Sequence, residues 1–384
     1  MMGLASIWLF PFALVKTLVA IVGHALGFAN VVQQEDHFAP HPSAGFEGYY
    51  SRTQLADGGT LAIVFCWVKH AKDRGNLVFL SYAPADEDGP PPFTFELYPE
   101  RLDAEVLTES TEGLASFVLR ASGVGTMTVT PTSVEYAISL PDETLTLNLR
   151  LKNRRSWSSS TPLEGPMGSL THLSPFLPLN WHVYSTGSKC EYIIAFREQT
   201  RLGDGRTHLE KNWGKSFPSG WIWSQAFEDD ERAISLAGGS ALPGVQAYLV
   251  GYRSAHYQWD FRPPFSVSIG PLSPFMKVKY SSRDGTVDLE VRTWLRKLIV
   301  NIKAPVGSFL GLPAPLPEGH RPRFAFESFR ATMYVGLYTR RWPWEEWTCV
   351  EADSCGTTRE GRPSCALEFG GAFCHLVQED KKRA

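Results

Sequence analysis

Strict alternation of apolar and polar residues most constrains what this chain can fold into. In residues 144–151, TLTLNLRL, leucine occupies every second position. Residues 285–294, GTVDLEVRTW, repeat the pattern with valine and leucine. Successive side chains of a strand point to opposite faces, so this period predicts strands that bury one face. Asp-Gly pairs at 57–58, 204–205 and 284–285 lie between such runs and predict tight hairpin turns.

Helical periodicity is scarce after residue 40, so the fold class we predict is all-β, with antiparallel strands. Two proline-rich stretches, 160–181 and 304–324, are predicted to be loops, because proline cannot donate a hydrogen bond within a central strand. The 384 residues are long for one compact core. We therefore predict two β-barrel-like or sandwich-like domains, 31–200 and 201–384, behind an apolar segment at 1–30.

The apolar segment determines the expected localisation. It is interrupted by Pro11 and Lys16, and it reaches the roughly 20 residues of a transmembrane helix only with Lys16 near its centre. A cleaved signal peptide, a membrane anchor, an amphipathic helix on the membrane surface and a helix packed on the body all remain open. We expect membrane association or entry into the secretory pathway (endoplasmic reticulum), with the N-terminus contacting the membrane surface.

Charge, cysteine content and motifs narrow the range of possible functions. The formal net charge is −3, so the basic footprint of a nucleic-acid-binding protein is missing. The sequence contains no P-loop, no G-x-G-x-x-G, no G-x-S-x-G and no H-E-x-x-H, which favours a function without a cofactor. One or two disulfides are expected rather than a metal site, with free thiols as the alternative. Four of the six cysteines lie near the C-terminus: Cys349, Cys355, Cys365 and Cys374.

Residues 208–227, HLEKNWGKSFPSGWIWSQAF, concentrate aromatic and ionisable side chains in one predicted hairpin. Alternation puts Trp221, Trp223 and Gln225 on one face of its second strand. This face either packs in a core or forms the wall of a pocket. In a pocket, a desolvated indole can stabilise a cation by about 1–2 kcal/mol, and the amide can orient a substrate oxygen.

The same stretch resembles the signature of the tocopherol cyclase family, roughly E-K-(N/D)-W-G-x-x-F-P-x-x-(W/Y)-x-W-x-Q. Residues 45–52, 177–192 and 324–337 are similar to further segments of that family, although Tyr49 stands where tryptophan is usual. The resemblance covers most of the chain after residue 40. It implies two lipocalin-like β-barrel domains. It also implies a reaction in which an alkene is protonated and a phenol oxygen adds to the carbocation, closing a chromanol ring.

Such a reaction needs a proton donor, aromatic faces around the cation and exclusion of water. Glu47 and Glu210 are the candidate acids, because burial raises the pKa of a carboxyl group. A salt bridge to a neighbouring basic residue would instead make either glutamate structural. His182 is the candidate acceptor of the phenol proton, with a hydrogen-bonded structural role as the alternative. The candidate substrate-binding residues, for each of which a core position is the alternative, are Tyr49, Trp181, Trp213, Trp221, Trp223 and Gln225.

We therefore expect a cofactor-independent cyclase of an apolar prenylated or polyketide-type small molecule, acting by alkene protonation and phenol addition or by a related pericyclic ring closure. The N-terminus does not resemble a Ser/Arg-rich transit peptide, so a tocopherol substrate is not assured. The alternative is a non-catalytic, lipocalin-like carrier of hydrophobic ligands. An acid that points into an apolar cavity beside Trp223 would favour the cyclase, and acids paired at the surface would favour the carrier.

Overall fold

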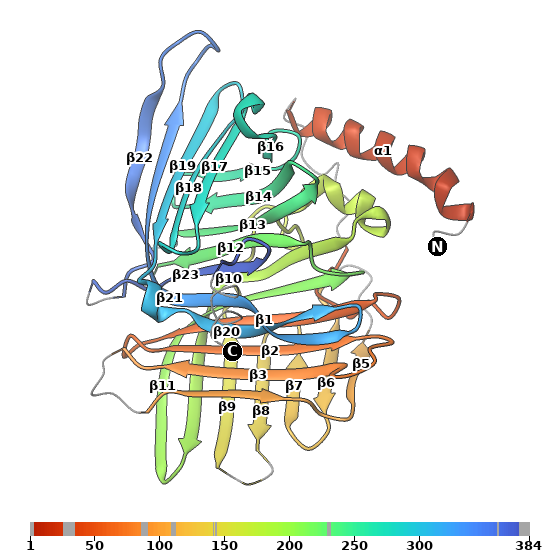
Figure 1. Ribbon diagram of the computed structural model, residues 1–384, viewed down its shortest axis with the longest axis vertical. Coiled ribbons are helices and arrows are strands. Elements are labelled where there is room, and N and C mark those ends of the chain that lie inside the picture. Colours follow the sequence, from red (N-terminus) through yellow and green to blue (C-terminus); the bar gives the residue numbers. More distant parts are fainter. Residues whose placement is uncertain are drawn as a thin grey trace.

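The computed structural model describes most of the chain: residues 4–25, 35–85, 91–108, 113–140, 142, 144–228, 232–358 and 361–375. Within these ranges, one long helix, α1 (Leu4–Ala25), precedes a body of antiparallel strands (Figure 1). Three short 3-10 helices interrupt the strands: η1 (Gly168–Phe176), η2 (Gly270–Leu272) and η3 (Val306–Ser308). The predicted fold class, all-β with an N-terminal helix, is confirmed.

The first sheet contains eleven strands, and two runs of consecutive strands, β1–β4 and β5–β11, meet where β1 pairs with β11. Their order is β4 (Phe93–Leu97), β3 (Asn76–Ala83), β2 (Thr60–Val68), β1 (Phe46–Leu55), β11 (Gln199–Gly214), β10 (Leu179–Phe196), β9 (Leu145–Lys152), β8 (Val134–Ser139), β7 (Gly125–Val129), β6 (Ser116–Ala121) and β5 (Leu102–Thr108). Figure 1 shows β1–β3 crossing β7–β9, so the sheet curls around its own core.

The second sheet contains twelve strands. Its main order is β15 (Gln258–Phe261), β14 (Val245–Arg253), β13 (Ala233–Leu242), β12 (Gly220–Phe227), β23 (Cys365–Gly371), β21 (Gly319–Thr339), β19 (Arg296–Lys303), β18 (Thr286–Arg292) and β17 (Met276–Ser281). β16 (Val267–Ser268) pairs with β14, while β20 (Leu310–Leu316) and β22 (Thr348–Cys355) pair with β21. The two curled antiparallel sheets are consistent with two lipocalin-like domains.

The chain passes from the first sheet to the second between β11 and β12, at residues 215–219. The sequence places the domain boundary earlier, between residues 200 and 201. β11 belongs with the first sheet because it fills the position between β1 and β10. One face of β11 therefore belongs to the first core, and its other face forms part of the outer surface of the first sheet.

Two of the three Asp-Gly predictions are confirmed. Asp57–Gly58 connects β1 to β2, Asp284–Gly285 connects β17 to β18, and both glycines have positive φ. The prediction for Asp204–Gly205 is wrong, because this pair lies inside β11. Glycine is required there for another reason: a Cβ on Gly205 would lie 2.4 Å from the carbonyl oxygen of Gln54 on the neighbouring strand.

The prediction that residues 304–324 form a loop is also wrong. β20 and the first residues of β21 lie within this stretch, and Pro313 and Pro315 belong to β20. Among the described strands, β20 pairs only with β21, so it has a free edge where a missing N–H is tolerated. The other proline-rich stretch contains η1 and ends in the first residues of β10.

The predicted disulfides do not form at Cys349 or Cys365, which are both free thiols. Cys349 is exposed on β22, opposite Tyr338 of β21. Cys365 is buried at the start of β23, with its sulfur 3.5 Å from the Ser224 hydroxyl. The two cysteines therefore face different neighbours, and the prediction is wrong for both.

α1 lies against η1, where the rings of Phe10 and Phe176 meet edge to face at 5.1 Å. Large apolar side chains of this helix, including Leu9 and Phe12, are exposed. None of the helices that the structure describes has both the length and the hydropathy needed to span a membrane.

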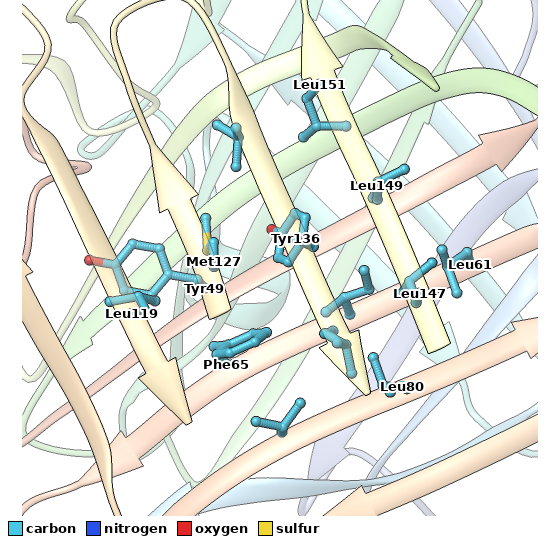
Figure 2. Packing of buried hydrophobic residues seen from close by; sticks show 14 of the residues in the cluster. Tyr49, Leu61, Phe65, Leu80, Leu119, Met127, Tyr136, Leu147, Leu149 and Leu151 are labelled. Atoms are coloured by element: carbon cyan, nitrogen blue, oxygen red, sulfur yellow. The ribbon is translucent and has the colours of Figure 1, made fainter. Parts of the chain in front are cut away.

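The alternating leucines fill the core of the first sheet. Leu147 and Leu149 of β9 are 0% and 1% exposed. Figure 2 shows them close to Leu61 across the curled sheet. A second core lies inside the second sheet, and a third apolar cluster joins the two sheets to each other. One strand that carries this third cluster, β12, is buried on both faces.

Replacing Leu147 with alanine should lower the free energy of unfolding by about 2–5 kcal/mol, because a buried cavity is created. Asn148→Ala, one position along on the exposed face of β9, should change it by less than about 0.5 kcal/mol. Urea unfolding of both variants measures the difference. Equal destabilisation would contradict the proposed burial of alternate residues.

Candidate active site

A cavity of about 490 Å³ lies between the two sheets. Its walls come from β1, β2, β3, β10 and β11 of the first sheet and from β12, β13, β14, β20, β21 and β23 of the second. Met167 and three leucines, in or beside η1, close part of it. The volume is in the range of small-molecule sites, about 300–1,000 Å³. Most lining residues are apolar, and the described lining contains no lysine, arginine or histidine.

Three indoles form part of this wall: Trp181 of β10 and Trp221 and Trp223 of β12. On β12 the two tryptophans are two residues apart and therefore share a face. Every residue of β12 is buried, because one face packs in the second core and the other faces the first sheet. The alternation in 220–227 thus directs both indoles to the cavity.

Glu210 of β11 is one of two carboxyl groups in the described cavity lining. The indole Nε1–H of Trp223 donates to its Oε2 at 3.0 Å, and His208 Nε2 lies 2.8 Å from the same oxygen. His208 and Glu210 are two residues apart on one face of the strand, and both are almost fully buried. This carboxylate is therefore held in place by two nitrogen groups at the cavity wall.

Glu368 of β23 is the other carboxyl group in the lining. The Nε1–H of Trp221 donates to Oε1 of Glu368 at 2.5 Å. Burial raises the pKa of Glu368 to about 7; the hydrogen bond from Trp221 opposes this shift, and the nearby negative charge of Glu210 adds to it. Of Glu210 and Glu368, Glu368 is the one whose side chain is partly accessible, and this side chain faces the cavity.

Glu327 of β21 lies directly opposite Glu368 in the paired strands. Like charges at such positions destabilise a sheet, so the pair favours a state with at least one proton. Burial, followed by the charge of Glu368, raises the pKa of Glu327 well above its usual range. The Tyr50 hydroxyl donates to Oε1 of Glu327 at 2.5 Å. Among the described residues Oε2 has no hydrogen-bond partner, which costs less for a neutral carboxylic acid than for a charged carboxylate in an apolar surrounding.

Gln225 does not line the cavity, although it shares a face of β12 with Trp223. Its Oε1 accepts a hydrogen bond from the guanidinium of Arg52 at 3.3 Å. That guanidinium is fully buried, also donates to the carbonyl oxygen of Ser364, and lies 5.5 Å from the ring centre of Phe227. Gln225 therefore binds a buried cation of the protein at this position.

Glu47 lies outside the cavity lining and is fully buried in an ion pair with Lys211. Its carboxylate also accepts the backbone N–H of His41, at 3.0 Å to both oxygens. Burial alone would raise the pKa of Glu47, but the charge of Lys211 and the hydrogen bond from His41 hold it below its usual value. Burial lowers the pKa of Lys211 to about 8, which the charge of Glu47 partly offsets. A charged, paired carboxylate is a poor proton donor, so this position fits the structural alternative.

Tyr49, Trp213 and His182 surround the same ion pair. Lys211 Nζ lies 5.0 Å from the ring centre of Tyr49 and 5.3 Å from that of Trp213. Burial lowers the pKa of His182 well below its usual range, and the charges of neighbouring basic groups add to this shift. These side chains and Glu47 are absent from the described cavity lining.

The structure thus divides the predicted site residues into groups. Four line the cavity: Glu210, Trp181, Trp221 and Trp223. The rest lie elsewhere: Glu47, Tyr49, His182 and Trp213 around Lys211, and Gln225 beside Arg52. Sequence reasoning missed Glu368 as a cavity acid and Glu327 as the buried acid opposite it. The available signal was a single glutamate in each of two apolar runs, FAFESF and CALEFGG.

No family model matches the chain. The fold is that of CghA. A crystal structure of CghA with Sch210972 aligns with a TM-score of 0.55 and 9% identity over 88% of this chain and 97% of CghA. A second CghA structure aligns with a TM-score of 0.55 and 10% identity over 90% and 99% of the two chains. Kievitone hydratase from Nectria haematococca gives a TM-score of 0.48 and 8% identity over 89% and 93%. At such low identity, the likeness to CghA establishes a shared architecture.

Within the described ranges, no group of His, Cys, Asp and Glu side chains is arranged to hold a metal ion. The chemistry that the cavity can supply from its own residues is proton transfer and hydrogen bonding by Glu368, hydrogen bonding by the Glu210 carboxyl group, and aromatic faces.

Glu47→Gln should lower the free energy of unfolding by about 3–5 kcal/mol, because it leaves Lys211 buried without its partner charge. Glu135→Gln is the matched control, since its ion pair with Arg150 is about half exposed and contributes about 0–1 kcal/mol. Urea unfolding at neutral pH measures both. Similar midpoints for the two variants would contradict the structural role of Glu47.

The pH dependence provides a second measurement of the same ion pair. Because the folded pKa of Glu47 is lowered, its stabilisation is present above its unfolded pKa of about 4.5 and is lost as pH falls through the folded pKa. Below that pH, the free energy of unfolding of Glu47→Gln should therefore fall less than that of the wild type. The free energy of unfolding of Glu135→Gln should fall as much as that of the wild type.

Proposed function

We propose that the protein is a cofactor-independent cyclase that closes a ring in an apolar prenylated or polyketide-type substrate. The observation that carries this proposal is a carboxyl group that can hold a proton near neutral pH, Glu368, at the wall of an apolar cavity with three indoles. This site suits the proposed substrate class, because a cavity lined mostly by apolar residues binds apolar molecules.

The charge balance between the sheets supports the protonated state of Glu368. Three carboxyl groups, Glu210, Glu327 and Glu368, are close enough that the charge of Glu210 raises the pKa of both others. Arg52 is the nearby cation that lowers the pKa of Glu327, and Arg52 is absent from the cavity lining. Ionising all three acids in an apolar region is costly, so Glu327 keeps its proton and Glu368 keeps its own up to a pH of about 7.

A balanced reaction follows from these groups. Glu368 donates its proton to an alkene carbon of the substrate, and the tertiary carbocation that forms is stabilised by the indole faces and the negative charge of Glu210. The phenol oxygen of the substrate then forms a bond to the cationic carbon. The phenol proton returns to the Glu368 carboxylate, so the net change is an isomerisation and the enzyme is regenerated.

A pericyclic ring closure can use the same arrangement with less proton movement. In that reaction Glu368 donates a hydrogen bond that polarises a substrate carbonyl, and the cavity holds the reacting carbons close together. CghA, which shares the fold, was crystallised with Sch210972. This supports a small-molecule site in the present protein as well.

The carrier alternative is less favoured by the same observations. A carrier of apolar ligands gains nothing from carboxyl groups at its binding surface, because burying them costs free energy. Glu210 faces the cavity and is bonded to Trp223, which is the arrangement expected of the cyclase. Turnover distinguishes the two: a carrier would bind polyenes or prenylated quinols and release them unchanged.

Glu368→Gln should lower kcat for ring closure by about 10²–10⁴-fold, because the amide cannot donate a proton to an alkene. The assay incubates the protein with a panel of prenylated quinols and linear polyenes, with ligand binding measured in parallel. Glu135→Gln, on the exposed face of β8, is the control and should retain full turnover. Unchanged turnover in Glu368→Gln would exclude it as the proton donor.

The pH profile tests the charge coupling between the two cavity carboxyl groups. Activity that depends on protonated Glu368 should fall as pH rises through about 7. Glu210→Gln removes a negative charge that raises the pKa of Glu368, so this alkaline limb should move to lower pH. The profile of kcat/KM for the wild type and the variant measures the shift. An alkaline limb at the same pH in both proteins would contradict the coupling.

A further inference from the structure

An exposed aromatic surface lies at one end of the second sheet. It consists of Trp294 and Leu295, in the turn between β18 and β19, with Trp342 and Trp344, in the hairpin between β21 and β22. Their exposed fractions are 59%, 43%, 48% and 78%, in that order. We call these four residues the aromatic rim. Exposed tryptophan of this extent is uncommon and indicates an interaction surface.

Hydrogen bonds tie the two segments of the rim together. Arg340 Nε donates to the carbonyl oxygen of Trp294 at 2.7 Å, which ties the hairpin to the turn. The Glu345 carboxylate accepts the backbone N–H groups of Arg341 and Trp342 at 3.0 and 3.1 Å. The rings of Trp342 and Trp344 are parallel within 3°, with centroids 5.5 Å apart. An ordered rim can bind a partner without a large loss of conformational entropy.

Charge around the rim opposes the charge of the whole chain. The two segments that carry it, 292–297 and 340–347, contain five basic and two acidic residues. The chain as a whole has a net charge of −3. A local positive excess beside exposed indoles is complementary to an anionic partner.

A lipid surface fits this combination better than a protein partner. Figure 1 shows the hairpin between β21 and β22 projecting beyond the neighbouring strands, so its tip can reach a flat surface. Indoles have an apolar body and a polar N–H, and they partition to the headgroup level of a bilayer. Basic side chains beside them pair with anionic lipids. We propose that the aromatic rim docks the protein on an anionic membrane surface.

This surface is separate from α1, the segment for which the sequence predicts membrane contact. The proposal also stands apart from the catalytic role of Glu368, because none of the rim residues lines the cavity. Docking would place the protein where apolar substrates accumulate, since such molecules partition from water into lipid.

The test is co-sedimentation of the full chain with vesicles of phosphatidylcholine alone and of phosphatidylcholine with phosphatidylserine. The wild type should bind the anionic vesicles more tightly, and added salt should weaken this binding. A Trp342→Ala and Trp344→Ala double variant should bind about tenfold more weakly, because its indoles no longer enter the headgroup layer. Arg341→Gln should weaken binding to anionic vesicles only. Leu202→Ala, which removes a side chain 79% exposed on the first sheet, is the matched control.

Loss of vesicle binding in the tryptophan variant, with binding kept in Leu202→Ala, supports the proposal. Several results would overturn it: no binding by the wild type, equal binding by the tryptophan variant, or loss of binding only when Leu9 and Phe12 of α1 are replaced by serine. A concentration-dependent dimer that the tryptophan variant abolishes, without vesicle binding, would assign the rim to a protein contact instead. None of these readouts uses turnover, so they are independent of the proposed cyclase activity.

Discussion

The contact between the outer face of the first sheet and the inner strands of the second is the constraint on which the rest of this structure depends. β12 has no exposed residue, because one set of its alternate side chains enters its own core and the other set faces β1 and β11. The same applies to most of β1. Both sets must therefore be compatible with burial, and the interface holds apolar side chains where a solvated sheet face would be polar.

Ionisable groups are buried on both sides of β1, and they behave differently according to their partners. On one side of β1, Glu47 meets Lys211 and is charged. On the other side, Glu368 meets only an indole N–H and two other acids, and its pKa rises. The difference arises because Coulomb interaction with a cation offsets the desolvation cost in one place and nothing comparable offsets it in the other. The proposed chemistry depends on this difference.

Some of the site was predictable from one short stretch, residues 208–227, although the hairpin predicted there is wrong, because β11 and β12 belong to different sheets. Glu210, Trp221 and Trp223 lie within a short segment, so alternation alone places the indoles on one face, and this face lines the cavity. Gln225 shares that face but lies farther along the strand, where Arg52 occupies the space. Local periodicity gives the face of a residue, but it does not give the residue that stands opposite it on another sheet.

The sequence by itself determined the class of fold, because a period of two can bury one face only in strands, and it determined two of the hairpins through their Asp-Gly turns. It did not reveal the partner of any buried charge. Glu47 and Glu368 both stand in apolar surroundings in the sequence, yet one is paired and the other carries the proton in the proposed reaction. Only the tertiary structure decided this. It places β23 between β12 and β21, although β12 lies far from β23 in the sequence. This arrangement determines which charged groups share one region of low dielectric constant.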